Sequence, residues 1–485
     1  MLFNSIQFIL FFVVVTLAYF SLNVTGRWVL LLAASCYFYM VFKPAFILIL
    51  AFTIVIDYLA GLWIEAEKNP KKRRWWLIIS IISNVGILAF FKYYDFGMEN
   101  FNRVFGSVGL FMPQLGSILP ESLRSWMVTG AGAVVLPIGL SFHTFQAMSY
   151  TIEVYRGNQK AERHFGIYAL YVMFYPQLVA GPIERPQNVL HQFHTYFKYD
   201  FENVKAGLMQ MAFGFFKKCV IADRLGLVVQ HAYHQPRDHN GLTLLVATFF
   251  YTFVIYCDFS GYSDIAIGAA RVMGYNLMEN FRTPYFSKSI TEFWGRWHIS
   301  LSTWFRDYLY IPLGGNRKGE LRGYANRMLV FLVSGLWHGA SWKFVIWGGL
   351  HGGFLLGESL RNKYLQKMGI NLPEGGIYSV IKVFVTFTLV MLAWVFFRVE
   401  HTTDAFVILR KIAHVSFSDE LKTPLNAAEM WFCVFLIIVL QIKEYYYLYV
   451  PTKNTAVFYT LFISTLVLTY FFGVFGSNQF IYFQF

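Results

Sequence analysis

The sequence carries little charge for its length. Only 14% of its 485 residues are Asp, Glu, Lys or Arg, whereas 56% are hydrophobic. An ordinary soluble domain carries about 25% charged residues. A water-soluble chain of this size would lack the polar side chains needed to cover its surface. The composition therefore argues against a soluble protein and predicts a chain that crosses a membrane many times.

Cysteine is also scarce, and several chemical signatures are missing. Cys36, Cys219, Cys257 and Cys433 form no CxxC pair and lie in apolar surroundings, so we expect small buried side chains rather than disulfides or a cysteine zinc site. A Cys257 nucleophile is disfavoured because the neighbouring Asp258 opposes a thiolate. No Walker loop, Rossmann fingerprint or Ser-His-Asp nucleophile elbow is present. If the protein is an enzyme, we therefore do not expect it to be driven by ATP bound in one of those folds.

Basic residues are in excess, with a net charge of +13. They lie in short loops between apolar runs, as in Lys71-Lys72-Arg73-Arg74, which is typical of cytoplasmic loops beside anionic lipid rather than of nucleic-acid binding. Placing residues 64–74 in the cytoplasm puts the N-terminus outside, 96–130 outside and 152–166 inside. The first apolar run has no basic region before it and no small-residue cleavage site, so we expect it to remain as a membrane helix.

About 11 apolar runs approach the roughly 20 residues that a spanning helix needs. Residues 167–182 are apolar but short and end in Pro and Gly, which predicts a re-entrant element. Residues 271–327 contain Trp294, Trp297 and Trp304 and are interpreted as lying at the membrane interface. Without repeats or a soluble linker, we expect one membrane domain over residues 1–485. The predicted spans are 5–22, 28–42, 44–63, 75–95, 131–150, 206–222, 241–257, 328–337 with 341–357, 375–397, 428–442 and 456–474.

His338 is the leading candidate for chemistry. It lies between two apolar stretches with Gly335 and Gly339 beside it, and glycine allows backbone or substrate to approach closely. An imidazole exchanges protons near neutral pH, and burial favours its neutral, basic form. Ionisable residues inside apolar spans default to functional hypotheses, but a structural histidine bonded to another helix remains open here. His351 lies 13 residues later, on nearly the opposite face of an ideal helix, although the intervening glycines could change that placement. No third ligand accompanies this pair, so no metal site is predicted.

Other polar residues are less specific. His298 lies among aromatic residues and could be an interface side chain. Asp258 and Asp264 lie near the end of a span, where they could bind a cation, cap a helix or bond to other spans. We favour a structural polar network for the two acids.

Several motifs together resemble the membrane-bound O-acyltransferases, and most closely their bacterial alginate O-acetyltransferase branch. They occur in the family's order from about residue 130 onward: 137–146, Tyr155-Arg156-Gly157, 177–183, 258–264, Glu279-Asn280-Phe281, Pro284-Tyr285, 293–315 and 334–342. The resemblance implies an all-α fold in which tilted, re-entrant and interfacial helices form a ring around a central tunnel. It places the family's near-invariant histidine on His338 and a second important histidine on His298. His143 departs from the aromatic residue expected at its position.

The resemblance further implies acetyl transfer in the bacterial inner membrane. A cytoplasmic thioester, expected to be acetyl-CoA with no bound cofactor, would donate the acetyl group. His338 would be the general base, or would help to form an acyl relay to an esterase-like extracytoplasmic partner that modifies a polysaccharide. A dry tunnel would protect the activated acyl group from water.

Three alternatives remain beside this expectation. The first is a D-alanyltransferase that acts on teichoic acid with a carrier-protein thioester, because the 293–315 stretch also resembles that branch of the family. A transporter would fit broken helices with polar groups at mid-membrane, although no equivalent halves are visible. A receptor or scaffold would leave the His, Arg and Trp residues between 292 and 342 unexplained.

Overall fold

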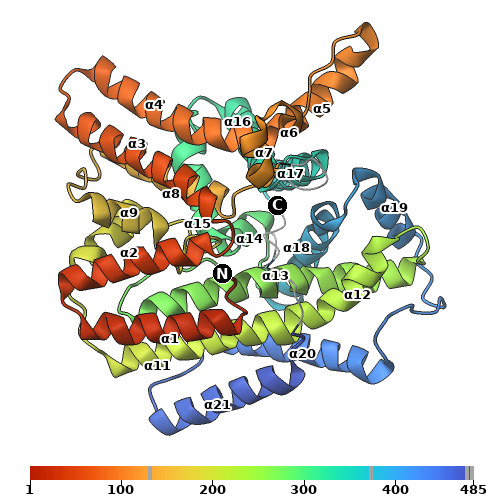
Figure 1. Cartoon of the computed structure of the whole chain (residues 1–485). Coiled ribbons are helices and arrows are strands. Elements are labelled where there is room, and N and C mark those ends of the chain that lie inside the picture. Colours follow the sequence, from red (N-terminus) through yellow and green to blue (C-terminus); the bar gives the residue numbers. More distant parts are fainter. Residues whose placement is uncertain (129–133, 371–372, 374, 476–479, 481–485) are drawn as a thin grey trace. The chain divides into compact units, whose positions relative to one another are not determined.

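The computed structural model describes residues 1–128, 134–370, 373, 375–475 and 480, and these residues are almost entirely helical (Figure 1). The described part of the chain contains no β-strand beyond an isolated bridge between Val128 and Val134. The all-α prediction is therefore confirmed. By internal contacts the chain forms two compact units, which are Met1–Val204 with Ala269–Leu277, and Lys205–Gly268 with Met278–Phe485. We describe each unit by itself, and the single membrane domain stays a prediction.

The first unit is a helical assembly around polar contacts. A buried carboxylate, Asp57, accepts hydrogen bonds from Ser80 (2.6 Å) and Asn84 (2.8 Å), which joins α3 to α4. Both helices also pack against α8. The helices of this unit are α1 (Ile6–Ser21), α2 (Val24–Met40), α3 (Ile47–Ala66), α4 (Pro70–Leu88), α5 (Tyr94–Phe105), α6 (Leu115–Ile118), α7 (Glu121–Met127), α8 (Leu140–Arg156), α9 (Phe165–Met173) and α10 (Pro186–Val189).

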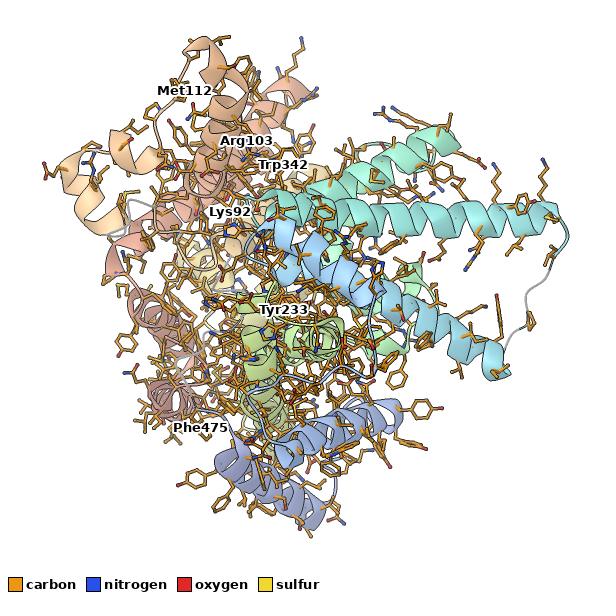
Figure 2. All side chains as sticks on the ribbon, turned by 90° about the vertical axis from the view of Figure 1, so that its right-hand side faces the viewer. Lys92, Arg103, Met112, Tyr233, Trp342 and Phe475 are labelled. Atoms are coloured by element: carbon orange, nitrogen blue, oxygen red, sulfur yellow. The ribbon has the colours of Figure 1, made fainter. Side chains whose placement is uncertain are left out.

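The second unit contains the candidate residues. Its core is built mainly of aromatic and aliphatic side chains from α12, α13, α14, α17, α18 and α20. Figure 2 shows α17 running away from Trp342, and side chains on its far half, such as Leu360 and Tyr364, are exposed. The helices are α11 (Phe201–Phe215) and α13 (Gly241–Val272), both shared with the first unit, α12 (Asp223–His234), α14 (Ile290–Arg296), α15 (Ile299–Phe305), α16 (Glu320–His338), α17 (Trp342–Lys367), α18 (Gly376–Arg398), α19 (Thr402–Ala413), α20 (Ala427–Tyr446) and α21 (Thr455–Phe472).

Most predicted spans coincide with a helix. Among the described residues, five helices are long and apolar enough to cross a membrane, at Pro44–Ala66, Pro70–Val108, Gly241–Val272, Gly376–Arg398 and Thr455–Phe472, with shorter apolar helices at Ile6–Ser21 and Val24–Met40. The chain is thus a multi-pass membrane protein, while the total of about 11 spans stays a prediction. Residues 131–133 of the predicted span 131–150 lie outside the described residues.

Two boundaries differ from the sequence prediction. The helix within 131–150 begins only at Leu140, because Gly139 before it adopts a left-handed φ of 74°. The predicted re-entrant stretch 167–182 is helical to Met173, and its irregular remainder is buried in the first unit, as backbone at membrane depth requires.

The three tryptophans of 271–327 are buried, and the interfacial position of this segment stays a prediction. Trp294, Trp297 and Trp304 are 9%, 2% and 5% exposed. They pack in the second unit, so their amphipathic rings serve protein packing there.

Candidate active site

His338 is the last residue of α16 and lies in an aromatic cage. Its side chain is buried, at 5% exposure. The imidazole ring centroid lies 5.1 Å from that of Trp347, with the rings perpendicular, and 5.3 Å from that of Phe397. Aromatic rings thus cover the imidazole on at least two sides.

Glycines let the backbone close around His338. A Cβ at Gly335 would lie 2.2 Å from the Phe344 carbonyl oxygen, and one at Gly348 would lie 2.2 Å from the Phe331 carbonyl oxygen. Both distances are far below a van der Waals contact, so α16 and α17 can cross this closely only without side chains at these positions. The predicted close backbone approach is confirmed for Gly335.

His338 and His351 do not share a helix. Residues 339–341 interrupt the chain between α16 and α17, so the ideal-helix placement does not apply and the alternative of a change at the intervening glycines holds. Both imidazoles contact the same indole, since Trp347 lies 4.9 Å from His351 and 5.1 Å from His338, centroid to centroid. The Trp294 indole N–H donates to Nδ1 of His351 over 3.3 Å. Because indole nitrogen is only a donor, neutral His351 carries its proton on Nε2.

His298 lies at the junction of α14 and α15 and is completely buried. Its backbone has a left-handed φ of 45°, which is uncommon outside glycine. Nδ1 lies 3.0 Å from Oδ1 of Asn280. His298 lies outside every predicted span, and burial lowers the pKa of its imidazole to about 3.

The two predicted histidines belong to one aromatic cluster. The ring of Trp337 lies 6.4 Å from that of His298 and 4.9 Å from that of His338. Phe259 and Phe281 also pack against His298, with centroids 4.7 Å and 6.4 Å away. The structure therefore brings the two residues near each other, and their catalytic roles stay predictions.

Asp258 forms a buried ion pair and Asp264 a partly buried one, as the structural polar network predicts. Lys218 Nζ lies 2.6 Å from an Asp258 oxygen and 2.9 Å from an Asp223 oxygen. Lys217 Nζ lies 2.6 Å from an Asp264 oxygen. The consecutive lysines are both buried because they lie in a π-helical turn, Phe216–Ala222.

The cysteines form no disulfide in the part of the chain that the structure describes. All four cysteines are free thiols, and Cys257 is buried. No group of three or more His, Cys, Asp or Glu side chains in the described ranges is arranged to hold a metal ion.

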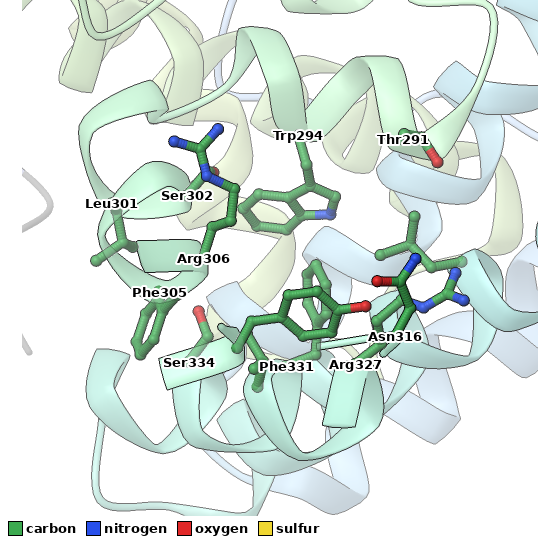
Figure 3. Close-up of a pocket in the computed structure, with 13 residues that line it drawn as sticks. Thr291, Trp294, Leu301, Ser302, Phe305, Arg306, Asn316, Arg327, Phe331 and Ser334 are labelled. Carbon is green, nitrogen blue, oxygen red and sulfur yellow. The ribbon is translucent and has the colours of Figure 1, made fainter. Parts of the chain in front are cut away.

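A cavity of about 440 Å³ lies against the aromatic cluster that contains His298 and His338 (Figure 3). Trp294 and Phe331 provide apolar wall, while Arg306 and Arg327 lie at opposite sides of the view. Sequence reasoning did not find the cavity, because α14, α15, α16 and α17 contribute to it from separate parts of the chain. The remaining lining residues are Thr291, Leu301, Ser302, Phe305, Tyr310, Asn316, Val330, Ser334 and Leu355.

The cavity is connected to the histidines through its walls. Ser334 lies one helical turn before His338 on α16. The backbone N–H of Leu301 donates to the His298 carbonyl over 3.0 Å. Trp294 joins the cavity to His351 through its indole N–H. A ligand in the cavity would thus lie against the residues that hold all three histidines.

Buried histidines at a glycine-lined helix break in a multi-pass membrane protein indicate a functional site within the membrane protein. The chain belongs to the MBOAT, membrane-bound O-acyltransferase, family, whose model matches residues 162–398. It is an O-acyltransferase.

Relatives agree with this assignment. A protein of Pseudomonas syringae pv. tomato named "Probable alginate O-acetylase AlgI" is 38% identical over 434 residues, which cover 89% of this chain and 78% of the relative. The "Peptidoglycan O-acetyltransferase" of Helicobacter pylori is 35% identical over 446 residues, covering 84% and 79%. The "Teichoic acid D-alanyltransferase" of Streptococcus thermophilus is 30% identical over 291 residues, covering 56% and 70%.

Proposed function

We propose that this enzyme transfers an acetyl group from a cytoplasmic thioester, acetyl-CoA, to a hydroxyl group of an extracytoplasmic polysaccharide, with His338 as the general base. The observation that carries the proposal is the burial of His338 and His298 in one aromatic cluster beside a cavity. The names of the relatives support acetyl as the acyl group, since the more extensive of the three matches are an alginate O-acetylase and a peptidoglycan O-acetyltransferase.

His338 would take the proton of the acceptor hydroxyl as its oxygen attacks the thioester carbonyl carbon. The tetrahedral intermediate then collapses, the carbon–sulfur bond breaks, and the imidazolium returns the proton to the departing thiolate. The products are an O-acetyl ester and free coenzyme A thiol. Aromatic side chains around the imidazole support this role because they keep it neutral and exclude competing water. His298 is proposed as a second catalytic residue of the same site.

The donor is proposed to enter the 440 Å³ cavity. Its apolar walls would receive the pantetheine arm of acetyl-CoA, and Arg306 or Arg327 would meet the phosphate groups. No bound cofactor is required, because the donor is consumed as a substrate.

The acceptor side is proposed from the family branch. The enzyme would lie in the bacterial cytoplasmic membrane with its N-terminus outside, so that the acetyl group crosses from a cytoplasmic donor to an outer acceptor. The acetyl group would pass to the polysaccharide directly or through an esterase-like extracytoplasmic acetyltransferase partner.

D-alanyl transfer from a carrier-protein thioester is the second candidate, favoured by the 30% identity to the teichoic acid enzyme. Purified protein in nanodiscs would be offered radiolabelled acetyl-CoA or D-alanyl carrier protein with glycan acceptors. We expect label transfer from acetyl-CoA, abolished in His338→Ala and retained in a variant of an exposed histidine, His191→Ala. Full activity of a folded His338→Ala protein would overturn the role of the histidine, and transfer only from the carrier protein would overturn the donor.

A further inference from the structure

The side-chain amide of Asn280 makes several hydrogen bonds next to His298. It is buried, and its Oδ1 accepts hydrogen bonds from the Ser300 backbone N–H (3.2 Å) and the Ser300 hydroxyl (2.9 Å). Its Nδ2 donates to the Ser263 hydroxyl over 3.3 Å. A backbone N–H can only donate, so the atom that it meets must be the amide oxygen and not the amide nitrogen. The orientation of the Asn280 amide is therefore fixed by the main chain.

This orientation decides where His298 carries its proton. Nδ1 of His298 lies 3.0 Å from the same oxygen. A carbonyl oxygen has no proton to give, so the contact is a hydrogen bond only if Nδ1 is protonated. In a neutral imidazole the other nitrogen, Nε2, is then the basic one.

We infer that Asn280 is a positioning residue that holds neutral His298 in the tautomer with its proton on Nδ1, so that Nε2 is the basic nitrogen of the ring in acyl transfer. The inference deepens the proposed function and rests on it for the catalytic consequence, although the tautomer itself does not. His351, in the same aromatic cluster, holds the opposite tautomer because Trp294 donates to its Nδ1. The site therefore contains two neutral imidazoles with their basic nitrogens at different ring positions.

Asn280 also fixes the backbone that carries the ring. Its carbonyl oxygen accepts the Ile299 backbone N–H over 2.9 Å, directly after the left-handed His298. A second backbone bond, from Arg282 N–H to the Arg296 carbonyl (2.9 Å), joins the same two segments. Asn280 thus bonds both to the imidazole ring of His298 and to the main chain directly after it. Rotation of the ring away from this position would break its hydrogen bond to Asn280.

The tautomer can be measured without activity. The full chain would be labelled with ¹⁵N-histidine, placed in nanodiscs and compared with His298→Asn to assign the His298 signals. We expect a protonated Nδ1 and an unprotonated Nε2 at pH 7 in the unaltered protein. In Asn280→Ala we expect a mixture of tautomers. A protonated Nε2 in the unaltered protein, or an unchanged tautomer in Asn280→Ala, would overturn the inference.

Kinetics then test the consequence. Asn280→Ala should lower kcat about ten- to hundredfold with KM changed less than about twofold, which is the usual size of a loss of a supporting residue. In Asn280→Asp a carboxylate oxygen can still accept from the His298 Nδ1, the Ser300 N–H and the Ser300 hydroxyl. We therefore expect this variant to have the tautomer of the unaltered protein and most of its kcat. Its carboxylate favours imidazolium, so the acid limb of kcat/KM should move to higher pH. Activity of Asn280→Ala equal to that of the unaltered enzyme would contradict the positioning role.

A matched control separates positioning from loss of folding. Asn326 is equally buried in the same unit, and its amide donates to the Gly315 carbonyl over 2.8 Å. Asn326→Ala should lower thermal stability without changing the His298 tautomer or the pH profile. If no variant or unaltered protein transfers acyl groups from any donor, the proposed function fails, while the ¹⁵N spectra still decide the tautomer.

Discussion

Gly335 and Gly348 face each other where α16 and α17 cross, and the other helix fills the space that a side chain at either position would need. The crossing holds His338 at the end of one helix and Trp347 in the other. The position of the imidazole therefore depends on two residues that have no side chains.

Alanine at either glycine should separate the two helices. A methyl group at Gly335 or Gly348 would meet backbone carbonyls at 2.2 Å, so the helices must move apart. Overpacking of this kind costs about 1–3 kcal/mol, and we expect a lower melting temperature with at least a tenfold loss of kcat. Gly353→Ala, at a position with open space on α17, is the matched control and should be nearly neutral. Equal melting temperatures for the Gly335→Ala and Gly353→Ala proteins would contradict the close crossing.

Lys218 should be essential for folding rather than for catalysis. It neutralises Asp258 and Asp223 in a buried site, with Nζ–oxygen distances of 2.6 and 2.9 Å. Lys218→Met would leave two carboxylates without their shared cation, and breaking a buried pair costs about 3–5 kcal/mol. We expect much less folded protein by size-exclusion chromatography, with recovery in Lys218→Met/Asp258→Asn/Asp223→Asn. Lys288→Met, at an exposed position, should behave like the unaltered chain.

Acid should destabilise the enzyme partly through His298. Its pKa of about 3 lies below the ordinary 6.5, so the unfolded state binds the proton more readily. The contribution of His298 to stability is complete above pH 6.5 and is lost as the pH falls towards 3; at pH 5 the loss is about 2 kcal/mol.

Unfolding measured from pH 7.5 to 5 should therefore show a shallower pH dependence in His298→Asn than in the unaltered protein. Other titratable groups near this ring are His338, across Trp337, and Asp258, next to Phe259 and paired with Lys218. Identical pH slopes in the two proteins would show that His298 is not the group responsible.

Arg327 should affect donor binding and leave the chemical step unchanged. It lines the cavity, and its guanidinium donates to the Ser359 hydroxyl over 2.7 Å. A charged hydrogen bond to a donor phosphate contributes about 1.5–3 kcal/mol, so Arg327→Met should raise the KM for acetyl-CoA at least tenfold with little change in kcat. Arg322→Met, on the exposed side of α16, serves as the control. A KM unchanged by the Arg327 substitution would leave Arg306 as the phosphate partner, and a KM also unchanged in Arg306→Met would place the donor elsewhere.

Apolar runs predicted the helices well because a membrane-spanning helix must be long and uniformly apolar, whatever its neighbours. Boundaries failed where one residue's backbone conformation decides the start, as at Gly139. The relative placement of His338 and His351 was left open in the sequence for a related reason. A helical periodicity argument assumes unbroken helix, and residues 339–341 break it.

Family motifs identified His338 and His298, but not the residues that support them. Asn280 belongs to a recognised segment, yet its contact with His298 spans 18 residues and depends on how two loops fold together. Trp294 and His351 are 57 residues apart and on different helices. Such pairs have no signal in local spacing, because only the packed structure brings them together.

The left-handed backbone at His298 has one more consequence. A non-glycine residue in this conformation stores about 1–3 kcal/mol of strain, and Thr283, in the neighbouring segment, is also left-handed, with a φ of 44°. The backbone around Thr283 and His298 is therefore strained, and the surrounding contacts hold it in this conformation. On gradual heating it should relax first, so that acyl transfer is lost at a temperature at which the helices, followed by circular dichroism, are still intact.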